Sequence, residues 1–173
     1  MNEPLSFKTR IEEIYTDIFY TGIIVPQTIA EQLIEGKNRR VVCHLNHAIK
    51  FQGGLMPDGK GDYYLTVSKE KRKQLDVGIG EEVNVQLEKD KSKYGIPVPE
   101  EIEALLEMDD EGSKYFHALT LGKQRSLLYI VAKPKNTDTR LRKALVIVDY
   151  LKTTKGKLDF KELNQAFKDA NKR

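Results

Sequence analysis

The spacing of apolar residues changes once along this chain, across residues 94–99, and the change limits the folds that the chain can adopt. Before it, apolar and polar residues alternate, most clearly at Val83, Val85 and Leu87, with the period of two that is typical of strands. After it, apolar residues recur every three or four positions, as between residues 141 and 151, which is typical of amphipathic helices. The sequence therefore predicts an α+β protein with a strand-rich part and a helical part.

Two domains are expected on either side of this change. A chain of 173 residues is long enough for one domain or for two small ones. The pattern favours residues 4–93 for the first domain and residues 98–173 for the second. Pro97 and Pro99 stiffen the segment that joins the two domains, so we expect a short packed crossing there rather than a flexible linker.

The first domain is expected to contain six short strands and one or two short helices. Pro26 suits the first position of a helix that Gly36 ends, and residues 69–76 suit a second helical turn. Six short strands in a flat sheet would leave exposed edges, which closure of the sheet removes. The predicted fold class is therefore α+β, with a small closed six-stranded β-barrel followed by a C-terminal helical region. The expected strands lie within residues 7–14, 17–25, 41–45, 48–51, 63–67 and 83–87.

The second domain carries several signals for the start of a helix. Pro99 precedes acidic residues that suit a first helical turn. Thr120 and Thr137 are expected to cap two further helices, and Asp159–Glu162 fits a capping box. The apolar run at residues 127–132 fits either a buried strand or a helix, and its length favours a helix.

Charge is divided sharply within the second domain. Residues 99–112 hold seven acidic residues and no Lys or Arg, whereas residues 123–157 have a net charge of +8. The two segments would neutralise each other if their helices packed side by side, or the basic segment would face an anionic partner. The candidate anion or partner contacts are Lys123, Arg125, Lys133, Lys135, Arg140, Arg142 and Lys143.

Motifs that would indicate catalysis or metal binding are incomplete. Residues 54–60 follow most of a phosphate-binding loop, but Gly61 stands where a Ser or Thr should hold magnesium. Cys43, His44 and His47 lie close in sequence, but alternation along a strand points His44 away from the other two. The chain also lacks a Gly-x-Ser-x-Gly nucleophile motif. The sequence therefore predicts no catalytic residue, no metal and no cofactor.

The single cysteine and the absence of a long apolar run indicate the cellular setting. One cysteine forms no intramolecular disulfide, so nothing points to an oxidising compartment. No stretch approaches the length of a membrane-spanning helix or of the apolar part of a signal peptide. We therefore expect a cytoplasmic protein.

The first domain resembles a bacterial β-barrel domain of unknown function in the runs VPQTIAEQLIEG, FQGGLMPDGKGDYYLTV and VGIGEEVNVQLEKD. The second resembles the helical region of the bacteriocin-protection, YdeI or OmpD-associated family in the runs VPEEIEALL and FHALTLGKQRSLLYIVAKPKNTDTRLRKALVIVDYL. The likeness covers about residues 5–151 and implies a role in envelope stress or in protection against antimicrobial peptides. Asp138 stands where the family's motif usually has Glu, which keeps the charge and shortens the side chain.

The resemblance and the missing catalytic motifs together predict a non-enzymatic binding or interaction protein. Its partner would be a protein or a small ligand, without membrane insertion, and the chain would be a monomer or a small homo-oligomer. Two alternatives stay open. A nucleic acid or another polyanion would bind residues 123–157, and an enzyme of unrecognised type would need a concave pocket lined by polar groups.

Overall fold

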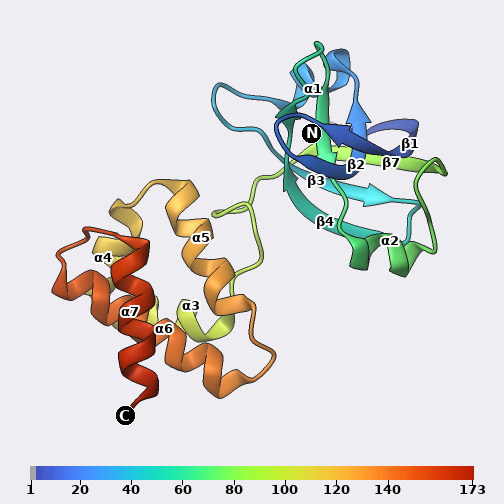
Figure 1. Cartoon of the computed structure of the whole chain (residues 1–173). Helices are drawn as coiled ribbons and strands as arrows, with labels where there is room; N and C mark the ends of the chain where they lie inside the picture. The colour runs from blue at the N-terminus through green and yellow to red at the C-terminus, as the bar shows by residue number, and fades with distance from the viewer. Residues whose placement is uncertain (1–2) are drawn as a thin grey trace. The chain divides into compact units, whose positions relative to one another are not determined.

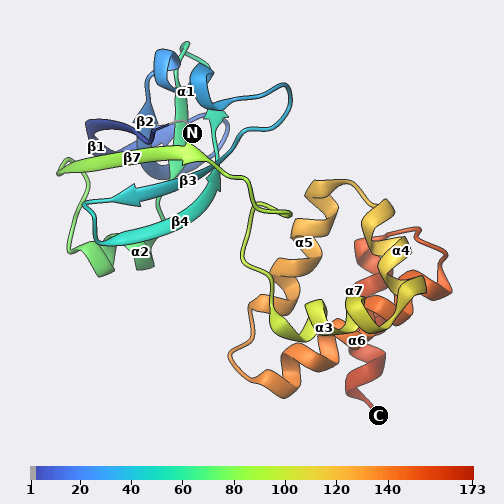
Figure 2. The same ribbon diagram turned by 180° about the vertical axis from the view of Figure 1, so that it is seen from behind.

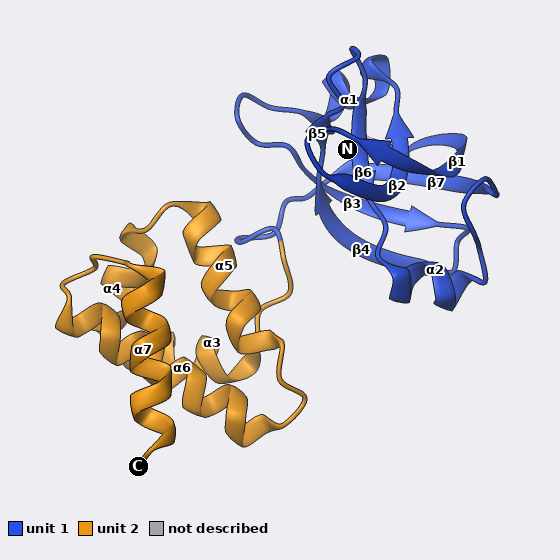
Figure 3. Ribbon diagram, in the orientation of Figure 1, with its two compact units in different colours: residues 1–95 blue, residues 96–173 orange. Residues whose placement is uncertain are grey.

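The computed structural model describes residues 3–173, shown in Figure 1 and from behind in Figure 2. The chain divides into two compact units, which we call unit 1, ending at Gly95, and unit 2, residues 96–173 (Figure 3). All strands of the described chain lie in unit 1, and unit 2 is built from helices.

Unit 1 is built around one sheet of seven strands in which every neighbouring pair is antiparallel. The strand order is β4-β3-β7-β1-β2-β6-β5, so β4 and β5 form the two edges. Helix α1 (Gln27–Leu33) follows β2, and helix α2 (Lys69–Leu75) precedes β7. The strands are β1 (Leu5–Tyr15), β2 (Phe19–Val25), β3 (Arg40–Leu45), β4 (Ile49–Gly54), β5 (Met56–Pro57), β6 (Tyr63–Thr66) and β7 (Glu82–Lys89).

The predicted closed six-stranded barrel is wrong, because the sheet has seven strands and remains open. The additional strand β5 has only two residues, and its Pro57 has no N–H group with which to extend a ladder. Edge strand β4 instead approaches β6, the strand next to the other edge. A Cβ atom on Gly53 of β4 would lie 2.6 Å from Cδ1 of Leu65 on β6. The sheet therefore curls on itself without a backbone ladder that closes it.

The core of unit 1 lies on one face of this sheet. Alternation along β7 buries Val83, Val85 and Leu87, and the short helix α1 adds Ala30 and Leu33. Burying one aliphatic side chain of this kind stabilises a fold by about 1.5–3 kcal/mol. The other buried members of this core are Ile11, Ile23, Val25, Val41, Cys43, Leu45, Leu55, Leu65 and Val67.

Unit 2 consists of five helices. The apolar run that fitted either a strand or a helix is helical, within α5, and Thr120 caps this helix by accepting a hydrogen bond from the Lys123 N–H. Asn136, not Thr137, caps α6, because the Asn136 side chain accepts a hydrogen bond from the Thr139 N–H at 3.0 Å. The helices are α3 (Glu100–Met108), α4 (Asp110–Ala118), α5 (Leu121–Ala132), α6 (Thr137–Thr153) and α7 (Phe160–Asn171).

Helix α6 is the central element of unit 2 and packs against α3, α4, α5 and α7 (Figure 2). The approach of α4 depends on Gly112, because a Cβ atom there would lie 2.5 Å from Cγ1 of Val148 on α6. Buried side chains of α6 include Ala144, Ile147 and Leu151. Across residues 3–173, none of the helices has the length and apolar character needed to cross a membrane.

Candidate interaction site

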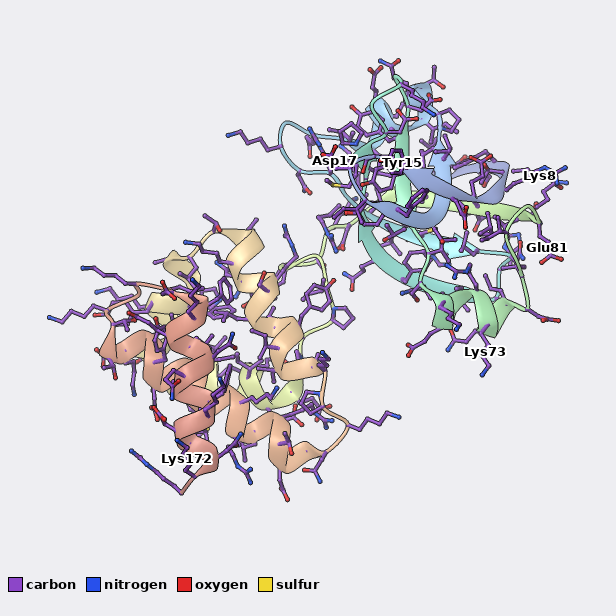
Figure 4. All side chains as sticks on the ribbon, in the orientation of Figure 1. Lys8, Tyr15, Asp17, Lys73, Glu81 and Lys172 are labelled. Carbon is purple, nitrogen blue, oxygen red and sulfur yellow. The ribbon has the colours of Figure 1, made fainter. Side chains whose placement is uncertain are left out.

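The end of the β1–β2 hairpin exposes three large apolar side chains that proteins usually bury. Tyr15 is 63% exposed, Ile18 63% and Phe19 70%. Tyr15 and Phe19 face each other in the ladder, with ring centroids 4.6 Å apart and ring planes inclined by 48°. Single exposed apolar residues are ordinary, but three neighbours form a patch of the kind that marks an interaction site. Figure 4 labels Tyr15 and Asp17 at this end of the hairpin.

The register of the hairpin explains why these side chains are exposed. Residues two apart on a strand share a face, so Tyr15 lies on the same face as Ile11. Ile11 is fully buried in the core, opposite Ile23 of β2. The pair of Tyr15 and Phe19 lies further along the same ladder, where the hairpin extends beyond the core. The face that is buried at Ile11 is therefore exposed at Tyr15.

The opposite face of the hairpin is packed. Ile14 lies opposite Tyr20 in the ladder, and the Tyr20 ring stacks on Tyr64 of β6 with centroids 5.5 Å apart. Ile14 and Tyr64 are both buried. Burial and the neighbouring Tyr20 raise the pKa of the Tyr64 hydroxyl above its ordinary value. This second apolar cluster anchors the hairpin, so its exposed face is presented on an ordered support.

The charged residues around the hairpin are acidic. Between Arg10 and Lys37 the chain has no Lys or Arg, and Glu12, Glu13 and Asp17 are all exposed. A basic group near the hairpin would therefore be attracted to it. We call the combined feature the hairpin surface, which consists of Glu13, Tyr15, Asp17, Ile18 and Phe19, whereas Glu12 lies on the opposite face with Ile14.

Arg140, one of the predicted anion contacts, is engaged within unit 2. Its Nε donates to Oε1 of Glu101 at 2.8 Å, and its other nitrogens donate to the carbonyl of Lys135 and to Thr137 Oγ1. The backbone N–H of Glu101 and the Arg140 guanidinium lower the pKa of the Glu101 carboxyl, against the effect of burial. The structure thus places Arg140 in a contact that holds the start of α6 against α3.

A second ion pair joins the acidic and basic segments of unit 2. Nζ of Lys152 donates to Oδ2 of Asp109 at 2.6 Å, and the other carboxylate oxygen of Asp109 caps α4 through the Gly112 N–H. Lys152 and then the Gly112 N–H lower the pKa of Asp109, and Asp109 raises the pKa of Lys152. The helices that carry opposite charge therefore do pack together and pair at two points.

The remaining predicted contacts are spread over α5, α6 and the connection between them. Lys123 lies at the start of α5 and Lys133 at its end, and Lys135 lies in the connection to α6. These three side chains are exposed, as is Arg142 on α6. Arg125 is half-buried on α5, and Nζ of Lys143 lies 5.6 Å from the centre of the Phe167 ring.

The residues considered for metal binding or catalysis lie where they contribute to the fold of unit 1. Cys43 is fully buried in the core, and burial raises the pKa of its thiol to about 12, so the reactive thiolate is absent near neutral pH. Nε2 of His44 lies 3.7 Å from Glu88, and His47 lies in the β3–β4 turn. Within residues 3–173, no group of three His, Cys, Asp or Glu side chains is placed to hold a metal. Gly54 leads into the short strand β5, not into a helix that would bind phosphate.

A pocket of about 320 Å³ in unit 2 bears on the enzyme alternative. Pro97 and Val98 form part of its wall, together with Glu101 and Arg140. Because Glu101 and Arg140 are paired with each other, the polar wall of this pocket already serves to hold α3 against α6.

The hairpin surface was not predicted from the sequence. It placed Tyr15 and Phe19 in or beside strands but assigned them no role. The available signal was the sequence YTDIFY, which keeps large apolar residues on both sides of a turn, where polar residues are usual.

Comparison with known families divides the chain in the same way as its two units. Residues 7–87 match the model of a domain of unknown function, DUF1905. Residues 96–153 match the model of a family described as bacteriocin-protection, YdeI or OmpD-associated. No curated protein and no solved structure matches the chain. The predicted resemblance to these two families is confirmed.

Proposed function

Because this chain joins a DUF1905 domain to a region of the bacteriocin-protection, YdeI or OmpD-associated family, we propose that it is a non-enzymatic interaction protein acting in envelope stress or in protection against antimicrobial peptides. Its partner is a basic peptide segment that also carries apolar side chains, and it binds at the hairpin surface. The exposed pair of Tyr15 and Phe19 beside the acidic residues Glu13 and Asp17 is the observation that carries this proposal.

The two halves of the hairpin surface give the partner its chemistry. The Tyr15 and Phe19 rings are large and already paired with each other, so binding would bury apolar area with little further loss of side-chain freedom. The carboxylates of Glu13 and Asp17 would steer a basic segment toward these rings and disfavour an acidic one. The expected contact combines charge attraction with apolar burial.

Residues 99–112 are the main competitor for a basic partner within the chain. They carry more negative charge than the hairpin surface, and Met108 among them is 84% exposed. However, Glu101 and Asp109 are already paired with basic residues of α6. Met108 also stands alone there as a large exposed apolar side chain, whereas the hairpin surface has three.

A peptide titration tests the proposal. The probe is a fluorescent amphipathic peptide of Lys and Leu, compared with a Lys and Ser peptide of equal charge and a Glu and Leu peptide of opposite charge. We expect saturable binding of the first peptide only. The double variant Tyr15→Ser/Phe19→Ser should weaken it by at least about tenfold, because each aromatic contact at such a site contributes more than about 1 kcal/mol.

The matched control is Met108→Ser, which removes a still more exposed apolar side chain in unit 2. It should leave the affinity within about twofold of the parent, as expected for a residue outside the contact. The proposal fails if Met108→Ser weakens binding as much as the hairpin variant does, or if the Lys and Ser peptide binds equally well. Thermal melting of each variant shows whether it is folded.

Polyanion binding through the basic segment is a second candidate, supported by the exposure of Lys123, Lys133, Lys135 and Arg142. A labelled 20-nucleotide single strand in the same titration tests it. Affinity that falls steeply with added salt, and that falls further in Lys133→Gln/Lys135→Gln, would favour this candidate over the hairpin surface.

A further inference from the structure

The geometry points to a second binding site in unit 1, a polar pocket that takes a small oxyanion carrying phosphate or carboxylate groups. The pocket has a volume of about 500 Å³. Its walls are the end of α1 with the turn that follows, the first residue of β3, and the end of β7 with the next three residues. This site lies outside the hairpin surface and goes beyond the function proposed above.

The acidic residue in the middle of the pocket wall has its oxygens already occupied. Oδ1 of Asp90 accepts a hydrogen bond from the Ser92 N–H at 2.8 Å, and Oδ2 accepts one from Nε2 of Gln52 at 2.8 Å. Burial would raise the pKa of Asp90, but hydrogen bonds from the Ser92 side chain, the Ser92 N–H and Gln52, together with the charge of Arg40, outweigh it and hold the pKa below its ordinary value. Asp90 is therefore an ionised structural residue whose acceptors are not available to a ligand.

The unused groups of the pocket are hydrogen-bond donors. Oδ1 of Asn38 accepts from the Arg40 N–H at 3.1 Å, which leaves the NH₂ group of Asn38 as the free end of that amide. Oγ of Ser92 accepts from Gln52 and from the Gly95 N–H, and its hydroxyl group is hydrogen-bonded to the Asp90 carboxylate, so Ser92 supports the pocket wall and is not counted among the free donors. Nζ of Lys91 makes no polar contact within residues 3–173.

The charge of the pocket also favours an anion. Arg40, Lys89 and Lys91 line it, against Glu35 and the internally bonded Asp90. Nζ of Lys89 lies 3.3 Å from Oε1 of Glu35, whose side chain is 76% exposed and therefore free to move aside. A ligand with several oxygens would replace Glu35 at Lys89 and engage Lys91 at the same time. Phosphate and carboxylate groups match this arrangement of donors.

Arg40 fixes the pocket without having to touch the ligand. Its Nη2 donates to the Gly95 carbonyl at 2.7 Å, and its own carbonyl accepts from the Asp90 N–H at 3.1 Å. Gly95 has a φ of 77°, and a Cβ atom there would lie 2.9 Å from Nε of Arg40. The loop after β7 is therefore held at both ends by one residue, which fixes the backbone from which Lys91 projects.

Titration of the full chain with inorganic phosphate, pyrophosphate and citrate, at constant ionic strength set by sodium chloride, tests the site. We expect saturable heat of binding in calorimetry for at least one of these probes and a higher melting temperature with it. Stronger binding of pyrophosphate identifies a phosphate ligand, and stronger binding of citrate identifies a carboxylate ligand.

Two substitutions with opposite expected signs make the test specific. Lys91→Gln should weaken binding about tenfold, because a charge-assisted hydrogen bond is lost. Glu35→Gln should strengthen it several-fold, because Lys89 no longer has a competing carboxylate. The control Lys37→Gln removes the same charge from an exposed residue that is near the pocket in sequence but does not line it.

The inference is overturned if none of the three anions binds saturably, or if Lys37→Gln weakens binding as much as Lys91→Gln does. The hairpin variant Tyr15→Ser/Phe19→Ser should bind the oxyanion with unchanged affinity. Loss of peptide binding and loss of anion binding are thus separate results.

Discussion

Unit 1 and unit 2 carry their charge in opposite ways. Residues 1–95 contain 14 basic and 14 acidic residues, whereas residues 96–173 contain 15 and 12. Unit 2 separates its charges widely in sequence, yet folding pairs Arg140 with Glu101 and Lys152 with Asp109. Unit 1 has no net charge, yet it keeps an acidic hairpin with exposed aromatic rings. The net charge of a segment is therefore a poor guide to whether it forms a binding surface. Whether its charged side chains are paired in the folded chain is a better one.

The largest effect is expected when one unit is destabilised and the other is observed. A Cβ atom on Gly22 of β2 would lie 2.1 Å from the Leu65 carbonyl oxygen of β6. Gly22→Ala must therefore push two paired strands apart, and we expect it to destabilise unit 1 by about 3 kcal/mol. Hydrogen exchange read by mass spectrometry should show faster exchange in peptides from β2 and β6 and unchanged exchange in α6.

The matched control for Gly22 is Gly122→Ala on α5. A Cβ atom on Gly122 meets nothing within 4 Å, so alanine should stabilise the helix by about 1 kcal/mol. If Gly22→Ala accelerates exchange in α6 as much as in β2, the two units do not fold independently.

An intermediate effect is expected from pH, because the ion pairs of unit 2 depend on ionised carboxylates. The pKa values of Glu101 and Asp109 are lowered in the folded chain from ordinary values of 4.5 and 3.8. Their contribution to stability is therefore complete above these values and is lost as pH falls below them. Melting followed by circular dichroism should show unit 2 losing stability between about pH 5 and pH 3.

Glu101→Gln should lower the stability of unit 2 at pH 7 and flatten part of this pH dependence. Glu103→Gln, an exposed neighbour on the same helix, is the control and should change neither. Equal pH dependence in the parent and in Glu101→Gln would contradict the assigned role of the pair with Arg140.

The smallest expected effect concerns Cys43 in unit 1. This thiol is fully buried and its pKa is raised to about 12, so iodoacetamide at pH 8 should label almost none of the folded protein. Labelling in denaturant should be complete, and Gly22→Ala should react faster than the parent. Rapid labelling of the parent would mean that the core of unit 1 opens far more readily than its packing suggests.

Local sequence signals predicted most of the elements. Alternation identified the six longer strands, and the cap residues Thr120 and Asp159 marked the starts of α5 and α7. The sequence did not predict α4 or the two-residue strand β5, because β5 is too short to show a period and α4 buries only Gly112 and Phe116, which make no apolar stripe. The closed barrel was inferred because a flat sheet of six strands would leave its edges exposed. Alternation within each strand does not show whether the first and last strands of a sheet are joined by hydrogen bonds.

The candidate sites were harder to predict than the elements. Lys and Arg residues are easily seen in a sequence, so the anion or partner contacts were predicted within residues 123–157. These contacts stay predictions. The exposure of Tyr15 and Phe19 depends on how far β1 and β2 extend beyond Ile11 and Ile23. The polar pocket joins residues 35–40 to residues 89–92, which no local pattern relates.

The close approach of Leu65 to Gly53 bears on how the curvature of the sheet in unit 1 is held. A barrel closed by a ladder changes its circumference only by breaking backbone hydrogen bonds. In unit 1 Leu65 of β6 lies over Gly53 of β4 and no ladder joins these two strands, so a change in their spacing costs side-chain packing but breaks no hydrogen bond between paired strands.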